Sequence, residues 1–290
     1  MACIRKWNMK KRKTMGTERD KGTTMIPELQ FARLSHGLLS YREAGKGRPV
    51  VLLHGMNGNS KSWAYQFAGL SDRYRVIAWD APGFGSSEVC EASPEGYVRA
   101  GLEFLRAVGA EEAVLVGHSM GGVVAARVAA EPGSPVAKLV LSCTHWGYAR
   151  ADAEELMPRY AKRIEEMQSL DRETYARIRA SKMLPPGTET SNPEVFALVA
   201  EVAGEGRAEG LAAAGRMIQS ADNRPIFSRL RLPVMILYGE KDPVISKEKT
   251  DELIAALPDA QVHMIPGAGH APYAEHSALY NALLDAFARA

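Results

Sequence analysis

The segment Leu115-Val116-Gly117-His118-Ser119-Met120-Gly121-Gly122 decides how this chain folds. An apolar run, residues 113–116, ends there in the pattern Gly-x-Ser-x-Gly, and small residues suited to a close-packed helix follow at 123–126. A serine at such a strand-to-helix turn stands clear of the backbone at the end of a sheet, where it can act as a nucleophile. Glycines flank it because the turn leaves no room for side chains on either side. The pattern alone also fits an ordinary Gly-Ser turn, but in this context it makes Ser119 the candidate nucleophile.

A serine hydroxyl needs a base, and the base needs an acid to orient it. Two apolar runs downstream, residues 233–238 and 261–265, lead into Asp242 and His270 respectively. Both residues therefore follow expected strands, at the edge where α/β sheets place functional groups. Taken singly, an aspartate before a proline and a loop histidine are ordinary turn residues. The order Ser119, Asp242, His270 is the one that accompanies this kind of serine turn, so we expect a catalytic triad.

Acyl transfer also needs backbone N–H groups aimed at the oxygen that becomes negative. The apolar run 49–53 leads into His54-Gly55-Met56, a loop that can supply one donor. We expect the two oxyanion-hole donors to be the N–H groups of Met56 and Met120. For His54 we favour a bracing role in this loop over a catalytic one.

Taken together, these segments resemble the α/β-hydrolase superfamily. Further matching stretches are Asp80-Ala81-Pro82-Gly83-Phe84-Gly85-Ser86-Ser87 and Gly239-Glu240-Lys241-Asp242-Pro243, and the matches span most of residues 28–290. The resemblance implies the fold and the triad, but it does not specify a substrate, because one scaffold of this kind hosts many reactions. We expect Asp80 to brace a tight loop rather than to bind a metal or a phosphate.

Composition sets further limits. The 290 residues are 46% hydrophobic and carry a formal net charge of +2, which gives no sign of a nucleic-acid partner. No apolar run approaches the roughly 20 residues of a membrane span. The three cysteines, Cys3, Cys90 and Cys143, show neither a disulfide framework nor a metal-ligand spacing, which suits a reducing, cytoplasmic location. We expect a small-molecule substrate, no cofactor and no metal; the sequence does not indicate an oligomeric state.

Residues 1–24 differ from the rest, because they are rich in lysine and arginine and poor in apolar residues. No apolar region follows the basic cluster, so the pattern is not that of a secretory signal. A basic arm that binds nucleic acid or a membrane surface is one interpretation. We favour a disordered basic extension, and without it the remaining chain is mildly acidic.

The rest of the sequence alternates between strands and helices, which predicts an α/β fold. We expect a doubly wound, mostly parallel eight-stranded sheet of the α/β-hydrolase type. The expected strands are 29–34, 37–43, 49–53, 74–79, 113–116, 138–143, 233–238 and 261–265. The expected core helices are 94–108, 120–130, 246–257 and 275–288.

Between residues 143 and 230 the alternation stops. Four helices are expected there, at 151–170, 172–183, 193–202 and 206–220. We interpret residues 145–225 as a helical cap inserted after the sixth strand, with 25–144 and 226–290 forming the hydrolase core. Such a cap would exclude water and shape the pocket. His145, Trp146 and Tyr148 open the cap and are expected to bind substrate, although Trp146 suits a packing role equally well.

The predicted function is that of a serine hydrolase that cleaves a small carboxylic ester or lactone through an acyl-enzyme intermediate. Capped members of the superfamily also include hydrolases that cleave a C–C bond of a vinylogous diketone with the same triad, and slow-turnover receptors of small molecules. Neither is excluded by the sequence. A serine at position 119 argues against haloalkane dehalogenases and epoxide hydrolases, which need a carboxylate nucleophile. A cofactor-free oxygenase is disfavoured because the loop after the sixth strand, residues 143–146, lacks a carboxylate.

Overall fold

The structure, a computed structural model, describes residues 26–151 and 154–290. The predicted basic extension at residues 1–24 lies outside the described residues. Within them, no helix has both the length and the apolar character needed to cross a membrane.

An eight-stranded sheet forms the centre of the molecule, in the order β1-β2-β4-β3-β5-β6-β7-β8. The strands are β1 (Leu29–Leu34), β2 (Gly37–Ala44), β3 (Pro49–Leu53), β4 (Arg75–Trp79), β5 (Ala113–His118), β6 (Val136–Ser142), β7 (Val234–Gly239) and β8 (Gln261–Ile265). The strands β1 and β2 form an antiparallel hairpin, and β2 also runs antiparallel to β4. The six neighbouring strands β4, β3, β5, β6, β7 and β8 pair in parallel, so their carboxyl ends meet at one edge of the sheet. The prediction of a mostly parallel eight-stranded sheet is confirmed.

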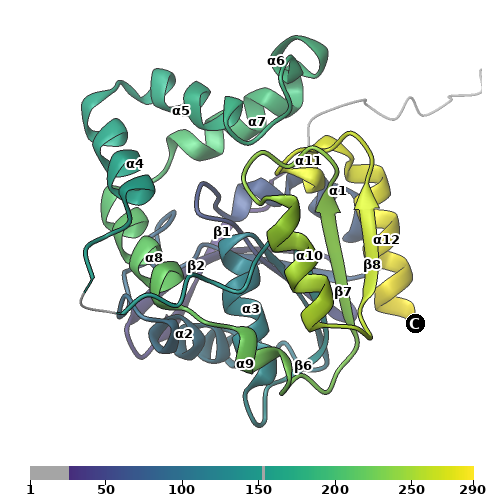
Figure 1. Cartoon of the computed structure of the whole chain (residues 1–290). Coiled ribbons are helices and arrows are strands. Elements are labelled where there is room, and N and C mark those ends of the chain that lie inside the picture. Colours follow the sequence, from purple (N-terminus) through teal and green to yellow (C-terminus); the bar gives the residue numbers. More distant parts are fainter. Residues whose placement is uncertain (1–25, 152–153) are drawn as a thin grey trace, which may run out of the picture.

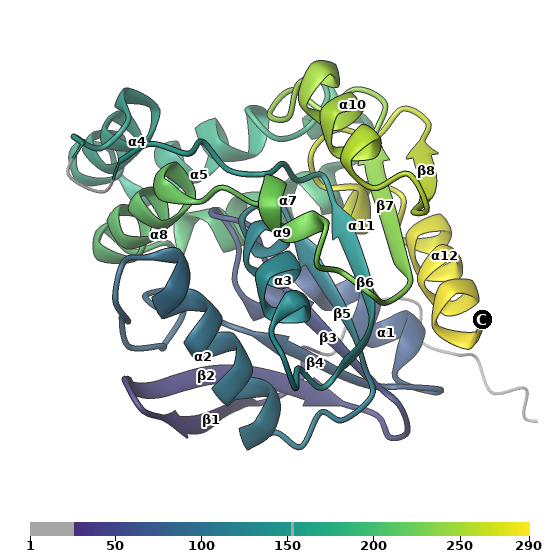
Figure 2. The ribbon, with the colours of Figure 1, turned by 60° about the horizontal axis from the view of Figure 1, so that its bottom comes forward.

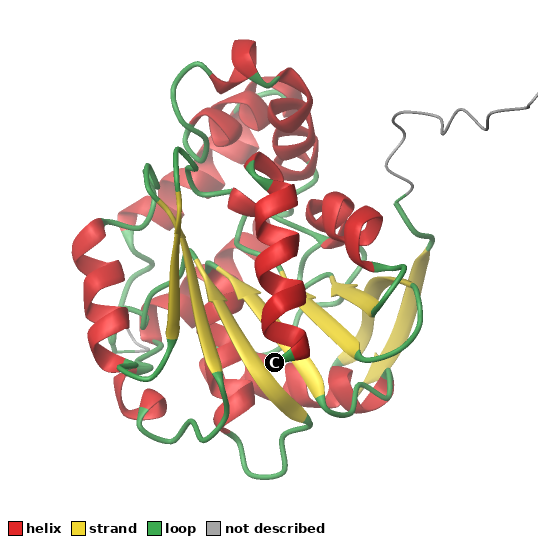
Figure 3. Cartoon of the chain, turned by 90° about the vertical axis from the view of Figure 1, so that its right-hand side faces the viewer, coloured by secondary structure: helices red, strands yellow, loops and turns green. Residues whose placement is uncertain are grey.

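Helices cover both faces of this sheet, as parallel strands with two apolar faces require. Figure 2 shows α2, α3 and α10 on one face and α1 and α12 on the other, and Figure 3 shows the strands running between these layers. The helices of these layers and the short helical segments near them are η1 (Ser60–Trp63), α1 (Ala64–Leu70), α2 (Pro94–Ala107), α3 (Met120–Ala130), α9 (Arg224–Phe227), α10 (Lys247–Ala256), α11 (Pro272–Glu275) and α12 (Ser277–Arg289). Ser93 caps α2, because its hydroxyl accepts the N–H of Gly96 at 3.0 Å.

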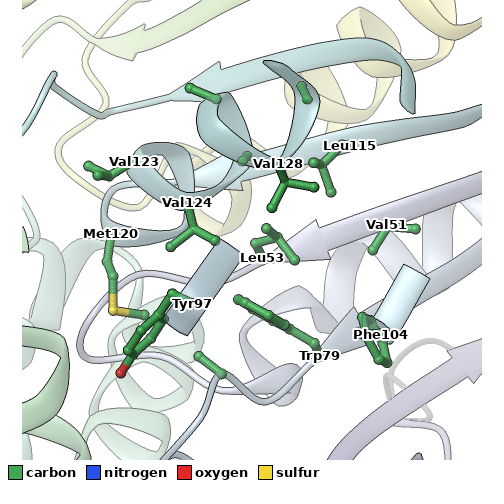
Figure 4. Close-up of a cluster of buried hydrophobic side chains, with 14 of the residues drawn as sticks. Val51, Leu53, Trp79, Tyr97, Phe104, Leu115, Met120, Val123, Val124 and Val128 are labelled. Atoms are coloured by element: carbon green, nitrogen blue, oxygen red, sulfur yellow. The ribbon is translucent and has the colours of Figure 1, made fainter. Parts of the chain in front are cut away.

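Alternate residues of each central strand enter opposite halves of the core. On β3, Val51 and Leu53 belong to the cluster under α2 and α3, whereas Val50 and Leu52 belong to the cluster under α1 and α12. Figure 4 shows the first cluster, with Leu53 below Val128 of α3 and Val51 above Phe104 of α2 in this view. The sheet is therefore packed on both faces.

Six helices of the described chain come between β6 and β7, and we call the first five the cap helices. They are α4 (Pro158–Ser169), α5 (Arg172–Ser181), α6 (Thr188–Ser191), α7 (Pro193–Gly204) and α8 (Ala208–Ser220). In Figure 1 they gather beyond the sheet, above and to the left of α3. The division of the chain into core and cap at residues 145 and 225 stays a prediction.

The first cap helix begins later than predicted, at Pro158 instead of residue 151. The residues described before it are not helical: Tyr148 and Ala149 donate their N–H groups to the carbonyl of Ala221, and Met157 donates to the side chain of Gln219 at 2.9 Å. Proline is favoured at the first position of a helix, where its missing N–H costs nothing. The helix therefore starts where these bonds to α8 end.

Asp80, at the end of β4, ties three elements together as expected of a brace. Its buried carboxylate accepts the hydroxyl of Ser40 on β2 at 2.5 Å and the N–H of Ser60 on η1 at 2.6 Å. These bonds explain the buried carboxylate of Asp80 as part of a tight structural loop, without a phosphate or a metal.

Replacing Asp80 with alanine is expected to destabilise the fold, because two buried donors lose their acceptor. Each buried polar group left without a partner costs about 1–3 kcal/mol. Urea unfolding measures the loss. The control is Asp72→Ala, which removes an exposed carboxylate bonded to Arg73 and should change the free energy of unfolding by less than about 0.5 kcal/mol. Equal losses in the two variants would contradict the bracing role.

Candidate active site

Ser119 adopts a backbone conformation that residues other than glycine rarely take. Its φ is 53° and its ψ is −116°, between the end of β5 and the start of α3. Such a conformation costs on the order of 1–3 kcal/mol and persists only where the surroundings enforce it. Here the N–H of Ser119 donates to the carbonyl of Ser142 at 2.8 Å, and the hydroxyl of Thr144 donates to the carbonyl of Ser119 at 2.6 Å. The strand β6 and the residues after it therefore hold the turn.

The glycines beside Ser119 are required by close contacts between backbones. A Cβ atom on Gly117 would lie 2.4 Å from the carbonyl oxygen of Gly121, and one on Gly121 would lie 2.2 Å from that of Leu53. The first turn of α3 thus packs directly on β5 and on the end of β3. The spacing of these glycines in the sequence is the consequence of this packing.

The structure brings the three predicted triad residues into one hydrogen-bonded chain. His270 Nε2 lies 3.1 Å from Ser119 Oγ, and His270 Nδ1 lies 2.8 Å from Asp242 Oδ2. An ionised carboxylate can only accept, so Nδ1 carries the proton and Nε2 presents its lone pair to the serine hydroxyl. This is the tautomer that a general base for Ser119 needs.

Asp242 is held in its ionised form by several donors. Burial by itself raises the pKa of this carboxyl, but the charge and hydrogen bond of His270 and the N–H groups of Ile245 and Val244 lower it below its usual range. The two backbone donors reach Oδ1 at 3.0 and 2.8 Å. The ionised carboxylate therefore stabilises the fold at pH values above its ordinary pKa, and this contribution is lost as the pH falls through the lowered pKa.

The loop that carries His270 is fixed on both sides. Glu275 accepts the N–H of Gly269 at 2.8 Å and that of Ala271 at 2.9 Å, and the N–H of His270 donates to the carbonyl of Met183 at 2.8 Å. The sequence analysis missed Glu275. The available signal was an acidic residue in the first turn of a short helix that follows a glycine-rich loop.

The amides of Met56 and Met120 make no hydrogen bond with any part of the chain that the structure describes. Met120 is the first residue of α3, where an N–H has no partner within the helix. The loop that carries Met56 approaches Ser119 closely, because a Cβ on Gly55 would lie 3.1 Å from Ser119 Cβ. Two unused donors therefore lie beside Ser119, and their role as an oxyanion hole stays a prediction.

His54 braces this loop, in agreement with the prediction. Its Nε2 accepts the N–H of Ala81 at 2.9 Å, and its Nδ1 lies 2.7 Å from the carbonyl oxygen of Gly55. Burial lowers the pKa of His54, so the ring stays neutral and keeps the lone pair that Ala81 needs.

A small cavity of about 70 Å³ adjoins Ser119 and His270. Its core side includes the loop 55–58, and its cap side includes Arg163, Arg179 and Lys182. The sequence analysis did not single out these cations. For Arg179 a signal existed, because it falls on the buried stripe of α5 marked by Tyr175, Ala176 and Ala180.

The cavity lining does not include His145, Trp146 or Tyr148. Trp146 donates its indole N–H to Glu252 on α10 at 2.8 Å, and the guanidinium of Arg224 lies 4.3 Å above its ring. The ring of His145 packs on that of Tyr148, with 4.9 Å between their centroids. The three side chains thus make packing contacts and do not line this cavity, and their role in binding substrate stays a prediction.

Among the described residues, Cys143, Asp242 and His270 form a group with metal-ligand chemistry, and their ligand atoms lie within 4.8 Å of one another. Two of these residues are already bonded to each other, and burial raises the pKa of the Cys143 thiol well above its usual value. A metal needs the thiolate, so this group does not favour metal binding.

Comparison with known proteins places this geometry in context. The family model for the alpha/beta hydrolase fold matches residues 48–277. A pimeloyl-[acyl-carrier protein] methyl ester esterase from Chromobacterium violaceum is 32% identical over 238 residues, which cover 80% of this chain and 91% of that protein. A thermophilic esterase from Thermogutta terrifontis is 26% identical with a TM-score of 0.78, covering 90% of this chain and 98% of that one. The enol-lactonase from Burkholderia xenovorans shares the fold with a TM-score of 0.79 at 21% identity, covering 90% of this chain and 100% of that one.

Replacing Glu275 with alanine is expected to slow the reaction of Ser119 with a fluorophosphonate by about 10²-fold. The two N–H groups that flank His270 lose their acceptor, and a shift of the base by about 1 Å has an effect of that size. Intact mass against time gives the rate. Glu248→Ala, which removes an exposed carboxylate from α10, should react at the parent rate. If the Glu275 variant also reacts at the parent rate, this residue does not position the base.

Proposed function

The chain belongs to the alpha/beta hydrolase fold family, and from that premise we propose that it is a serine hydrolase that cleaves a small carboxylic ester or lactone through an acyl-enzyme intermediate. The observation that carries the proposal is the hydrogen-bonded chain from Asp242 through His270 to Ser119, with two unused amides beside it. An activated serine and free donors for an oxyanion are what acyl transfer requires.

In the proposed reaction, His270 Nε2 takes the proton from Ser119 as Oγ attacks the carbonyl carbon. The N–H groups of Met56 and Met120 stabilise the oxyanion, and Asp242 stabilises the imidazolium and keeps its orientation. The leaving alcohol then takes the proton back from His270. Water, deprotonated by His270, attacks the acyl-enzyme and releases the acid. Each step uses a group already in place, so the chemistry is complete without further residues.

The names of the relatives favour an ester over other acyl compounds. Two curated relatives, at 32% and 28% identity, are named as methyl ester esterases, and a solved relative at 26% identity is named as an esterase. We propose a small-molecule substrate with the cap helices closing over it, and a cytoplasmic location on the grounds given by the cysteine content. No nucleic-acid or membrane partner is proposed.

The first test addresses the nucleophile. A fluorophosphonate should add once to the parent protein, because only a serine activated by a base reacts quickly with it. Ser119→Ala should show no adduct in intact-mass analysis. An adduct that persists in this variant would exclude Ser119 from the mechanism.

The second test separates ester cleavage from the C–C cleavage of a vinylogous diketone. Short-chain aryl esters should be hydrolysed by the parent protein. Ser119→Ala should reduce kcat by several orders of magnitude, toward the roughly 10⁶-fold loss seen when such triads are removed. In C–C cleavage, His270 first transfers a proton that converts the dienol to its ketone, so the same variant would accumulate the keto form. If esters and lactones are inert and this ketone accumulates, the ester proposal is wrong.

A further inference from the structure

Two arginines of the cap helices line the cavity that contains Ser119. Arg163 comes from α4, Arg179 comes from α5, and Lys182 follows the end of α5. The cavity measures about 70 Å³, so these cations face a confined space beside Ser119.

The cations outnumber the carboxylates available to them. Glu166 forms an ion pair with Arg179 and lies 3.4 Å from Lys182. Arg163 takes part in none of the ion pairs found among the described residues, and its Nε is buried without a hydrogen-bond partner, like the Nε of Arg179. One carboxylate therefore serves three positive charges.

Two carboxylates near His270 are bonded to groups other than these cations. Asp242 is bonded to His270 and to two backbone N–H groups. Glu275 is bonded to the N–H groups of Gly269 and Ala271. Both are engaged in holding His270 and its loop, and neither forms an ion pair with the three cations among the described residues, so the cap side keeps more cationic than anionic side chains.

An anion in the cavity would relieve this excess. Burial lowers the pKa of Arg163, and the neighbouring charge of Arg179 lowers it further, which indicates that the two guanidinium groups repel each other in a poorly solvated place. A guanidinium offers paired donors that match the two oxygens of a carboxylate, and such charged hydrogen bonds are strong where water is excluded.

We propose that Arg163 and Arg179 form an anion subsite, so that the substrate carries an ionised carboxylate a short carbon chain away from the ester carbonyl that reacts with Ser119. This inference rests on the proposed ester hydrolysis and adds the substrate class: a half-ester of a short dicarboxylic acid, or a lactone that bears a carboxylate. The core supplies the bond cleavage, and the cap arginines select for the second charge.

The first experiment measures binding without catalysis. In Ser119→Ala, monomethyl glutarate should raise the Tm, whereas the neutral dimethyl glutarate should not. Adding Arg163→Gln should abolish the shift, and adding Arg177→Gln should preserve it, because Arg177 lies exposed on the same helix as Arg179 and pairs with Glu189. The half-ester and the diester raising the Tm equally would overturn the subsite. A larger shift with inorganic phosphate than with the half-ester would overturn the assignment to a carboxylate.

The second experiment measures specificity. The parent should hydrolyse monomethyl glutarate with a higher kcat/KM than dimethyl glutarate. Arg163→Gln should lower kcat/KM for the half-ester by about 10- to 100-fold, the size expected for losing hydrogen bonds to a charged group. It should change kcat/KM for the diester by less than about twofold. Arg163→Lys keeps the charge but loses the paired donors. Its kcat/KM for the half-ester should fall between those of the parent and Arg163→Gln.

The outcomes separate this inference from the proposed function. Binding that depends on Arg163 with neither ester hydrolysed would retain the anion subsite and reject ester hydrolysis. Hydrolysis of both esters with equal kcat/KM, unchanged in Arg163→Gln, would retain ester hydrolysis and reject the subsite. Arg163→Gln is expected to fold, because Arg163 has no partner among the described residues to lose.

Discussion

The left-handed backbone at Ser119 is the constraint on which the site depends. It is stable only because glycines on either side let α3 pack against the ends of β5 and β3, and because the carbonyl of Ser142 accepts the serine N–H at 2.8 Å. This turn presents the hydroxyl at the edge where the parallel strands end. Every other functional group must therefore reach that edge.

The base meets this requirement from 151 residues away along the chain. His270 is oriented by Asp242, its loop is held by Glu275, and its own N–H donates to the carbonyl of Met183. Met183 belongs to the segment between β6 and β7, so the cap helices contribute directly to the position of the base. A change in how these helices pack would move His270 as well as reshape the cavity.

The charged side chains around the site are divided between the core and the cap helices. Parallel strands that are covered on both faces need mostly apolar residues, and β3 and β5 consist mainly of such residues. Few positions beneath the site can therefore carry a charged side chain. The cap helices are amphipathic, so a single residue such as Arg179 can replace an apolar one on the inward stripe without disturbing the sheet. Substrate selection and bond cleavage can therefore be specified by different parts of the chain.

The sequence by itself indicated the sheet, the serine turn, the order of Ser119, Asp242 and His270 and the positions of Met56 and Met120, because each depends on a local signal: an apolar run that ends in a glycine-rich turn. It also predicted that His54 and Asp80 act as braces. Only the tertiary structure decided that Glu275 holds the His270 loop, that Trp146 pairs with Glu252 away from the cavity, and that Arg163 and Arg179 face Ser119. These depend on where the cap helices pack on the core, which is set by contacts between residues far apart in the chain and leaves no local pattern to read.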